Sequence, residues 1–220
     1  MGSRVQRLRL RVRQRARRRL GLSLVVVGLA LLGAVAYQLW GTGVVTSRAQ
    51  AAFRREIAEH GFPDRPRAGQ PIGVIRIDAI ELDMAVVQGA NWWTLMRGPG
   101  HYASTPLPGQ GGNVAIAGHR TTFLHPFGAL DRVRAGDLIA VQTGSGEFVY
   151  RVVWQRILPP GATWVTQPTA RPSLTLTTCW PRFSSAKRLV VRAVQVYGAV
   201  PGGFLHEVSL GSQSASPARS

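Results

Sequence analysis

Cysteine and carboxylate side chains are scarce in this chain of 220 residues. Cys179 is the only cysteine, which excludes an intramolecular disulfide framework and leaves no pair of thiolates for a zinc site. The ten acidic residues are dispersed along the sequence and form no cluster of calcium ligands. The spacings of His101, His119 and His125 match no metal-ligand set. The sequence therefore predicts neither a metal site nor another cofactor.

Basic residues are abundant, and they are concentrated at the N-terminus. The formal net charge is +17, and nine of the 27 basic residues are arginines within residues 1–19. Such a segment by itself is also typical of a nucleic-acid-binding arm. The rest of the chain has no zinc-finger spacing, no RNA-binding aromatic signature and no isolated recognition helix. We therefore expect no nucleic-acid partner.

An uncharged segment over residues 20–40 follows the arginines. About 20 residues of helix span roughly 30 Å, the thickness of the hydrocarbon core of a bilayer. Tyr37 and Trp40 stand at its far end, where aromatic rings favour the interface. The pattern predicts a single-pass transmembrane anchor in the cell membrane, with residues 1–19 in the cytoplasm and the rest of the chain outside the cell. A cleavable signal peptide is the alternative, because residues 34–36 have the small-x-small form of a cleavage site.

The segment after the anchor, residues 41–70, is expected to be a helical stalk and linker. Thr46 or Ser47 is suited to cap a short helix, and prolines and glycines then interrupt regular structure. The folded domain is expected over residues 71–200. Residues 201–220 are rich in Gly, Ser and Pro, which predicts a flexible tail.

From residue 71 onward the sequence has the pattern of short β-strands. Apolar or alternating runs are separated by clusters of glycine, proline, asparagine and aspartate, a spacing typical of a β-sandwich or a closed barrel. Short helical turns are expected at residues 91–96 and 126–130. The fold class is therefore all-β with short helices. The expected strands cover residues 72–77, 84–88, 113–117, 138–142, 147–154, 173–178 and 189–196.

Cys179 stands at the end of an expected strand, in the sequence Thr-Leu-Thr-Thr-Cys-Trp-Pro. Pro181 predicts a loop, and a second strand begins at Leu189. If the two strands pair antiparallel, Cys179 and Arg188 become cross-strand partners with β-carbons about 5 Å apart. A permanent cation beside a thiol favours the nucleophilic thiolate. A buried structural cysteine is the alternative, since free cysteine often behaves as a small core residue.

The combination of Cys179, the pair Gly118-His119 upstream and Arg188 downstream resembles the sortase family of cysteine transpeptidases. The resemblance covers residues 71–197 and includes the order of the three residues. It implies a closed, eight-stranded antiparallel β-barrel, preceded here by the transmembrane helix. It also implies that Cys179 is the catalytic nucleophile, that His119 is the general acid and base, and that Arg188 stabilises the oxyanion.

Two further arginines, Arg182 and Arg192, are rivals for the oxyanion role, which suits a permanent charge with a fork of donors. Arg188 matches the family pattern best, because a hydrophobic strand follows it directly. Thr177 and Thr178 precede the cysteine, and we expect them to offer a hydroxyl or a backbone amide for substrate binding.

Other features resemble one subclass, the class E housekeeping sortases of high-GC Gram-positive bacteria. They are the N-terminal anchor, the Trp-Pro pair after Cys179, and Gly-Pro-Gly-His-Tyr at residues 98–102. Tyr102 looks like the tyrosine that favours Leu-Ala-x-Thr-Gly over Leu-Pro-x-Thr-Gly signals, with a core aromatic as the alternative. The implied activity cleaves a C-terminal sorting signal between Thr and Gly through a thioester. The acyl group then passes to an amine of a cell-wall precursor, so the implied partners are that precursor and signal-bearing surface proteins.

Other functions stay open at this point. A pilin-polymerising sortase would use a lysine of a pilin as the amine. A non-catalytic, membrane-anchored wall-binding barrel would keep Cys179 as a structural residue. An L,D-transpeptidase or a papain-like hydrolase would also use Cys and His, but their Ser-His-Gly-Cys and Cys-Gly-Ser-Cys-Trp signatures are absent.

Overall fold

The computed structural model describes residues 2–63, 65–200 and 203–204. The chain divides into two compact units, Met1–Thr42 and Gly43–Ser220. The first unit is helix α1 (Gly2–Ala36), which is followed by the π-helical turn η1 (Tyr37–Gly41). Within α1, the segment Arg17–Ala36 is apolar and long enough to cross a membrane. The helix predicted over residues 20–40 is therefore present, although its last residues form the π-helical turn.

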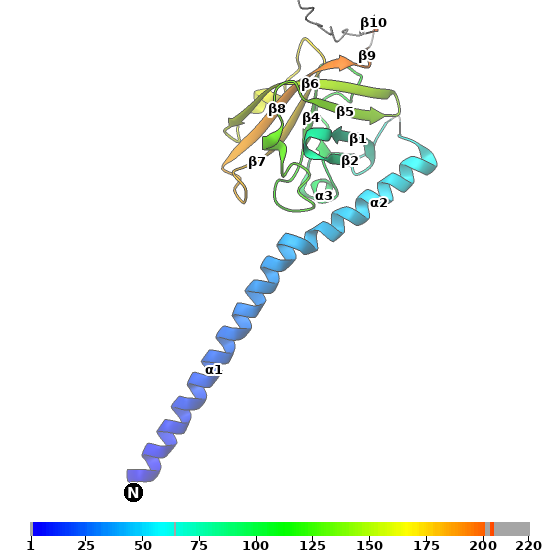
Figure 1. Ribbon diagram of the computed structural model, residues 1–220. Helices are drawn as coiled ribbons and strands as arrows, with labels where there is room; N and C mark the ends of the chain where they lie inside the picture. Colours follow the sequence, from blue (N-terminus) through cyan, green and yellow to red (C-terminus); the bar gives the residue numbers. More distant parts are fainter. Residues whose placement is uncertain (1, 64, 201–202, 205–220) are drawn as a thin grey trace, which may run out of the picture. The chain divides into compact units, whose positions relative to one another are not determined.

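The second unit is built on a closed barrel of eight strands in the order β1-β2-β3-β4-β7-β8-β6-β5 (Figure 1). The predicted all-β barrel is confirmed. The strand that the sequence did not reveal is β3, because two residues are too short to show an alternating pattern. The barrel strands are β1 (Pro71–Ile77), β2 (Leu82–Gln88), β3 (Gly100–His101), β4 (Asn113–Ala117), β5 (Leu138–Thr143), β6 (Gly146–Leu158), β7 (Ser173–Trp180) and β8 (Lys187–Tyr197).

Two of the neighbouring pairs in the barrel are parallel, β2 with β3 and β4 with β7. Parallel strands need a crossover connection. The chain passes from β2 to β3 through the short helix α3 (Trp92–Leu95), and the hairpin of β5 and β6 lies between β4 and β7 in the sequence. The barrel is thus largely, rather than wholly, antiparallel.

The alternation of side chains along β7 and β8 separates the core from the outer face of the barrel. Leu174, Leu176 and Val191 point inward and are fully buried in the main core cluster. Side chains two residues apart lie on the same face of a strand. Thr177 and Cys179 therefore lie together on the outer face.

Helix α2 (Thr42–His60) packs on the outside of the barrel (Figure 1). Phe53 is 2% exposed and forms a small second core with Ala85 and Val87 of β2. Helix α2 therefore lies in the same compact unit as the barrel, Gly43–Ser220. Thr46 does not cap a helix, because α2 begins before it and its hydroxyl donates to the Met96 carbonyl at 2.7 Å.

The short helical elements lie in the connections between strands. The helical turn predicted at residues 91–96 is present as α3, which Asn91 caps by accepting a hydrogen bond from the Thr94 amide at 3.0 Å. The turn predicted at residues 126–130 is present and leads into the 3₁₀ helix η3 (Leu130–Arg132). Two further 3₁₀ helices, η2 (Asp78–Ile80) and η4 (Thr163–Thr166), were not predicted.

Strand β9 (Ala199–Val200) pairs with β10 (Gly203–Phe204) beyond the barrel. The tail predicted over residues 201–220 otherwise lies outside the described residues.

Candidate active site

Cys179 and Arg188 are cross-strand partners in the antiparallel pair of β7 and β8. Directly opposed residues have β-carbons about 4.5 to 5.5 Å apart. Both side chains are partly exposed on the outer face of the barrel. The hairpin register predicted from the sequence is confirmed. The Arg188 guanidinium itself donates to the Ser185 carbonyl at 2.9 Å and to the Lys187 carbonyl at 3.1 Å.

His119 follows the neighbouring strand and reaches the same end of the sheet. Strand β4 runs parallel to β7, with Ala117 opposite Thr177 as the last pair. The Gly118 amide extends this ladder by donating to the Thr177 carbonyl at 3.1 Å. Two residues further on along each strand lie His119 and Cys179, so the parallel register brings the imidazole and the thiol to adjacent strand ends.

Aromatic rings surround the His119 imidazole. Its ring centre lies 5.7 Å from that of Trp92 in an edge-on arrangement and 5.0 Å from that of Phe123. The Nε2 atom is buried and has no hydrogen-bond partner among the described residues. Burial lowers the pKa of His119 below its ordinary value of about 6.5, because a charged ring would lose solvation here. The neutral imidazole is therefore the dominant form at neutral pH.

Core packing requires a glycine at residue 118, directly before His119. A β-carbon at residue 118 would lie 2.6 Å from the ring of Phe127, which is fully buried in the core. No other residue type fits there without displacing that ring. The glycine of the Gly118-His119 pair is therefore required by the packing of the core beside His119.

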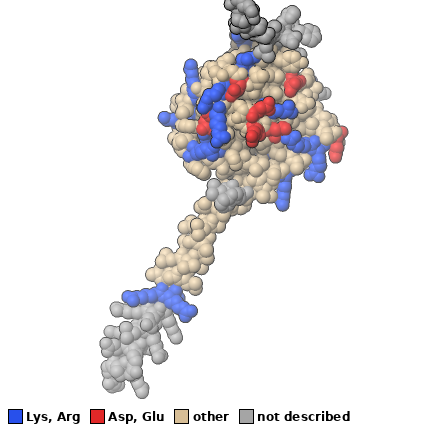
Figure 2. All heavy atoms as spheres, viewed as in Figure 1, with Lys and Arg blue, Asp and Glu red and all other residues tan. Residues whose placement is uncertain are grey.

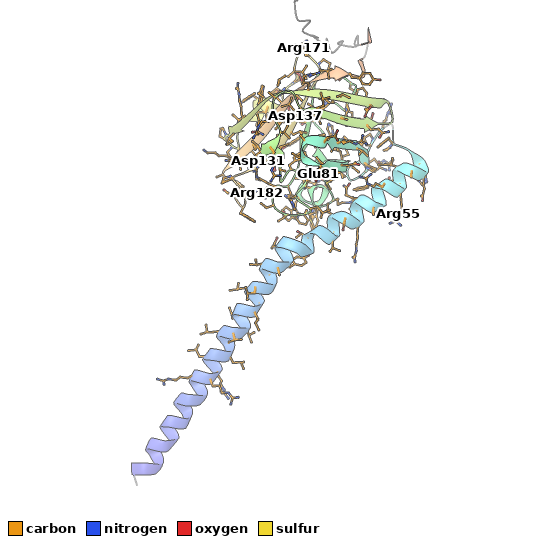
Figure 3. All side chains as sticks on the ribbon, in the orientation of Figure 1. Arg55, Glu81, Asp131, Asp137, Arg171 and Arg182 are labelled. Carbon is orange, nitrogen blue, oxygen red and sulfur yellow. The ribbon has the colours of Figure 1, made fainter. Side chains whose placement is uncertain are left out.

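The three arginines that competed for the oxyanion role have different places in the structure. Arg182 donates to the Gly128 carbonyl at 2.7 Å and joins the loop after β7 to the loop after His119. Figure 3 shows Arg182 and Asp131 at the same margin of the barrel. Arg192 is buried and donates to the Val165 carbonyl at 2.8 Å. Arg188 is therefore the one of the three that stands opposite Cys179.

A pocket of about 220 Å³ adjoins Arg188 on the outer face of β7 and β8. The connection between β6 and β7, including η4, forms one wall, and Tyr102 lies on another side. Thr177 lines the pocket and lies two residues before Cys179 on the same face. An extended peptide in this pocket would therefore lead toward the thiol. The lining residues are Tyr102, Pro159, Pro160, Ala162, Thr163, Val165, Thr166, Thr177, Arg188 and Val190.

The residues predicted to bind substrate differ in their position. The hydroxyl groups of Tyr102 and Thr177 lie 3.2 Å apart, and both residues line the pocket. The Thr178 hydroxyl is buried and donates to the Gly118 carbonyl at 2.7 Å. Thr178 thus joins the two site strands, and the structure gives no support to a substrate contact of its side chain.

One backbone carbonyl fixes the wall of the pocket. The Val165 oxygen in η4 accepts hydrogen bonds from Asn113 Nδ2 at 2.9 Å, Thr175 Oγ1 at 3.2 Å and Arg192 Nη2 at 2.8 Å. All three donors are buried. A connection without regular strands is in this way held firmly against the sheet.

Sequence reasoning missed several residues of the site. Trp92 touches the imidazole although it is 27 residues away in the sequence, and the only signal was the Trp92-Trp93 pair in the predicted helical turn. Arg120, directly after His119, forms an ion pair with Asp131 at 3.1 Å and lies over the ring of Trp180. His101, by contrast, is fully buried and hydrogen-bonds Gln88 and the Pro106 carbonyl. Its role is therefore structural.

Comparison with known proteins identifies relatives of this chain. Residues 75–196 match the sortase domain family. Sortase SrtE1 of Streptomyces coelicolor is 32% identical over 191 residues, which cover 76% of this chain and 53% of the relative. Sortase D of Bacillus subtilis is 31% identical over 118 residues, which cover 53% of this chain and 58% of the relative. The chain thus spans little more than half the length of these two relatives.

Solved structures show the same fold. Sortase E from Streptomyces avermitilis aligns with a TM-score of 0.54 at 32% identity, over 59% of this chain and 90% of that chain. Sortase E1 from Streptomyces coelicolor, with a tripeptide in its active site, aligns with a TM-score of 0.56 at 29% identity, over 60% and 91% of the two chains.

Proposed function

Since the chain belongs to the sortase family, we propose that it is a cysteine transpeptidase that cleaves a C-terminal sorting signal between Thr and Gly. One observation carries the proposal: Cys179 and Arg188 are cross-strand partners, and His119 lies two residues beyond the end of β4, the strand on the other side of β7. Nucleophile, oxyanion donor and proton carrier are thereby supplied by three adjacent strands. Strands are rigid, so they fix the positions of catalytic side chains more accurately than loops do.

The reaction begins when the Cys179 thiolate attacks the carbonyl carbon of the threonine. The carbonyl oxygen becomes an oxyanion, which the Arg188 guanidinium stabilises by charge and directed hydrogen bonds. The C–N bond then breaks, and the His119 imidazolium gives its proton to the leaving amine of the glycine. A thioester on Cys179 results. An acceptor amine attacks this thioester, His119 takes up a proton, and Cys179 is released.

The surroundings of His119 limit the rate of this reaction. The active enzyme needs a thiolate together with an imidazolium, and burial favours the neutral imidazole. The reactive pairing is therefore a minor fraction of the enzyme at neutral pH. Because few enzyme molecules carry the imidazolium at any time, we expect a slow turnover.

The pocket beside Arg188 fits the residues of a sorting signal that precede the scissile bond. Tyr102 and Thr177 form a polar contact on one side, and prolines and threonines of the connection between β6 and β7 form the other. The tyrosine ring narrows the pocket and favours a small second residue, so we propose Leu-Ala-x-Thr-Gly as the preferred signal. Signal-bearing surface proteins and an amine of a cell-wall precursor are the proposed partners.

The N-terminal helix is the proposed membrane anchor. Its segment Arg17–Ala36 has the length and the apolarity to span a bilayer, and arginines precede it. Arginine-rich flanks stay on the cytoplasmic side, so we propose that the barrel lies outside the cell.

The test is a transfer assay with the full chain in detergent micelles. Paired Leu-Ala-x-Thr-Gly and Leu-Pro-x-Thr-Gly peptides are incubated with triglycine, and mass spectrometry detects cleavage after Thr and the triglycine adduct. Cys179→Ala and His119→Ala should each abolish transfer while the circular dichroism spectrum stays unchanged, because the two groups act as one unit. More than a few per cent of the wild-type activity in Cys179→Ala would overturn the proposal.

A further inference from the structure

The barrel unit exposes an unusual cluster of large apolar side chains near the start of α2. They come from three segments: the first turn of α2, helix α3 and the loop after His119. We call this cluster the apolar face. Its members and their exposed fractions are Val44 (48%), Val45 (38%), Trp92 (58%), Trp93 (74%) and Leu124 (43%).

Contacts join the three segments into one surface. Val45 and Trp93 line the same shallow hollow. A β-carbon at Gly43 would lie 3.1 Å from Leu124 Cδ2, so the start of α2 touches the loop after His119. Trp92 in turn packs edge-on against Phe123, with 5.6 Å between the ring centres. Contiguous exposed apolar surface of this kind marks a site of protein or membrane interaction.

The apolar face cannot collapse into the core, because its supports are fixed. Gln50 of α2 donates to the carbonyls of Ala85 and Arg97, and both bonds are 3.0 Å or shorter. Leu124 has a φ of +58°, which is costly for a residue other than glycine. Leu124 thus has a costly backbone conformation while 43% of it stays exposed, and such strained residues are common at functional sites.

The segments that supply the apolar face carry basic residues and no acidic ones. Residues 1–55 and 84–130, which include every member of the face, contain no aspartate or glutamate. Arg48 is exposed on α2, and Arg97 lines the hollow beside Trp93. Figure 2 shows acidic side chains in view over the barrel but none on its lower margin. Such a surface suits a negatively charged partner with an apolar interior, which describes an anionic lipid bilayer.

The short stretch of chain between the proposed anchor and the apolar face favours a bilayer over a protein as the partner. The proposed anchor ends at Ala36, and Gly43 opens the barrel unit seven residues later. Seven residues reach at most about 25 Å even when fully extended. Val44 and Val45 must therefore stay close to the membrane surface if the anchor spans it.

We propose that the apolar face docks on the surface of an anionic membrane, with the indole rings of Trp92 and Trp93 at the level of the lipid headgroups. Indole rings favour that level because one edge is polar. The inference rests on the proposed membrane anchorage of this enzyme. It has a consequence for catalysis, because Trp92 touches His119. Docking would turn the catalytic end of the sheet toward substrates that are held at the membrane.

The first test measures contact with lipid directly. The full chain is reconstituted in phosphatidylglycerol vesicles whose acyl chains carry bromine, which quenches nearby tryptophan fluorescence. Trp40→Phe is used as the background, so that the anchor contributes no signal. Adding Trp92→Phe and Trp93→Phe should remove at least half of the remaining quenching. The matched control is Trp164→Phe, which removes a residue that is 49% exposed in η4, outside the face, and should leave the quenching unchanged.

The proposal is overturned if the background variant shows no quenching by brominated lipid, or if Trp164→Phe removes as much of it as the double substitution. Replacement of phosphatidylglycerol by neutral phosphatidylcholine should weaken the quenching, since the arginines then lose their attraction to the surface. These measurements need no transfer activity, so they test docking independently of the proposed reaction.

The second test separates docking from chemistry. Trp93→Glu introduces a charge into the apolar face at a residue that does not contact His119. We expect transfer from a water-soluble peptide to triglycine to stay within two-fold of wild type. Transfer to an amine displayed on the vesicle surface should fall at least five-fold. Val153→Glu adds the same charge at a residue that is 45% exposed on β6, and should leave both activities unchanged. Equal loss in the two variants, or no loss in Trp93→Glu, would contradict docking.

Discussion

The Arg120 guanidinium carbon lies 4.4 Å from the ring centre of Trp180, so the residue after His119 is stacked on the residue after Cys179. Arg120 also pairs with Asp131 at 3.1 Å, and its side chain is only 2% exposed. Cation–π contacts of desolvated guanidinium groups are worth about 2 kcal/mol. We infer that Arg120 positions the two catalytic strand ends relative to each other.

Arg120→Met should therefore lower both stability and turnover. Loss of one partner of a buried ion pair typically costs about 3 to 5 kcal/mol, and the partial exposure of Asp131 reduces this to about 2 to 3 kcal/mol. The melting temperature should fall by about 5 to 10 °C. On folded enzyme, kcat should fall about ten-fold while KM for the peptide changes little, because the pocket is intact. Arg120→Lys should recover part of the loss.

Arg54→Met is the matched control for the ion pair. Arg54 and Asp83 also lie 3.1 Å apart, but their side chains are 51% and 48% exposed. Its removal should change stability by less than about 1 kcal/mol and leave kcat unchanged. If Arg120→Met lowers the melting temperature but not kcat, Arg120 has no positioning role.

Arg188 is expected to need its guanidinium geometry and not only its charge. A guanidinium offers parallel donors to an oxyanion, whereas lysine is a point charge. Loss of one preorganised oxyanion donor costs roughly 10² to 10³ in rate, so Arg188→Lys should lose about that factor in kcat and Arg188→Ala at least as much. Rates are compared with those of Arg76→Lys, an exposed residue of β1. Wild-type rates in Arg188→Lys would assign the oxyanion to another donor.

Stability should decrease as the pH falls below about 6.5. Burial lowers the pKa of both His101 and His119, so the unfolded chain binds more protons than the folded chain in this range. Stability is therefore fully present above the unfolded pKa and is lost toward pH 5. Thermal unfolding between pH 5 and 8 should show this slope, and His101→Gln should flatten it. A melting temperature that rises on acidification would contradict a lowered pKa of these two histidines.

Phe53→Ala tests whether α2 belongs to the barrel unit. The phenyl ring is 2% exposed, packs on Ala85 and Val87, and lies 4.7 Å under the Arg97 guanidinium. Its truncation should cost about 3 kcal/mol and lower the melting temperature by about 6 to 12 °C. Val44→Ala, at an exposed position of the same helix, should be nearly neutral. Equal melting temperatures in the two variants would indicate that α2 is a free stalk that does not pack on the barrel.

The sequence predicted what depends on local pattern. Alternating apolar residues revealed seven of the eight barrel strands, and the short loop between Cys179 and Arg188 set the register of the last hairpin. The uncharged run before residue 40 predicted the first helix. These features are encoded within a few consecutive residues, so periodicity and turn chemistry suffice to find them.

Tertiary structure decided what depends on residues that are distant in the sequence. The parallel pairing of β4 with β7 brings His119 to Cys179 across 60 positions, and no local pattern records it. The same holds for Arg120 over Trp180, for Phe53 on β2, and for the wall of the pocket that the Val165 carbonyl anchors. Polar and apolar groups find these partners only when the barrel closes, because closure alone brings its strand ends and connections together.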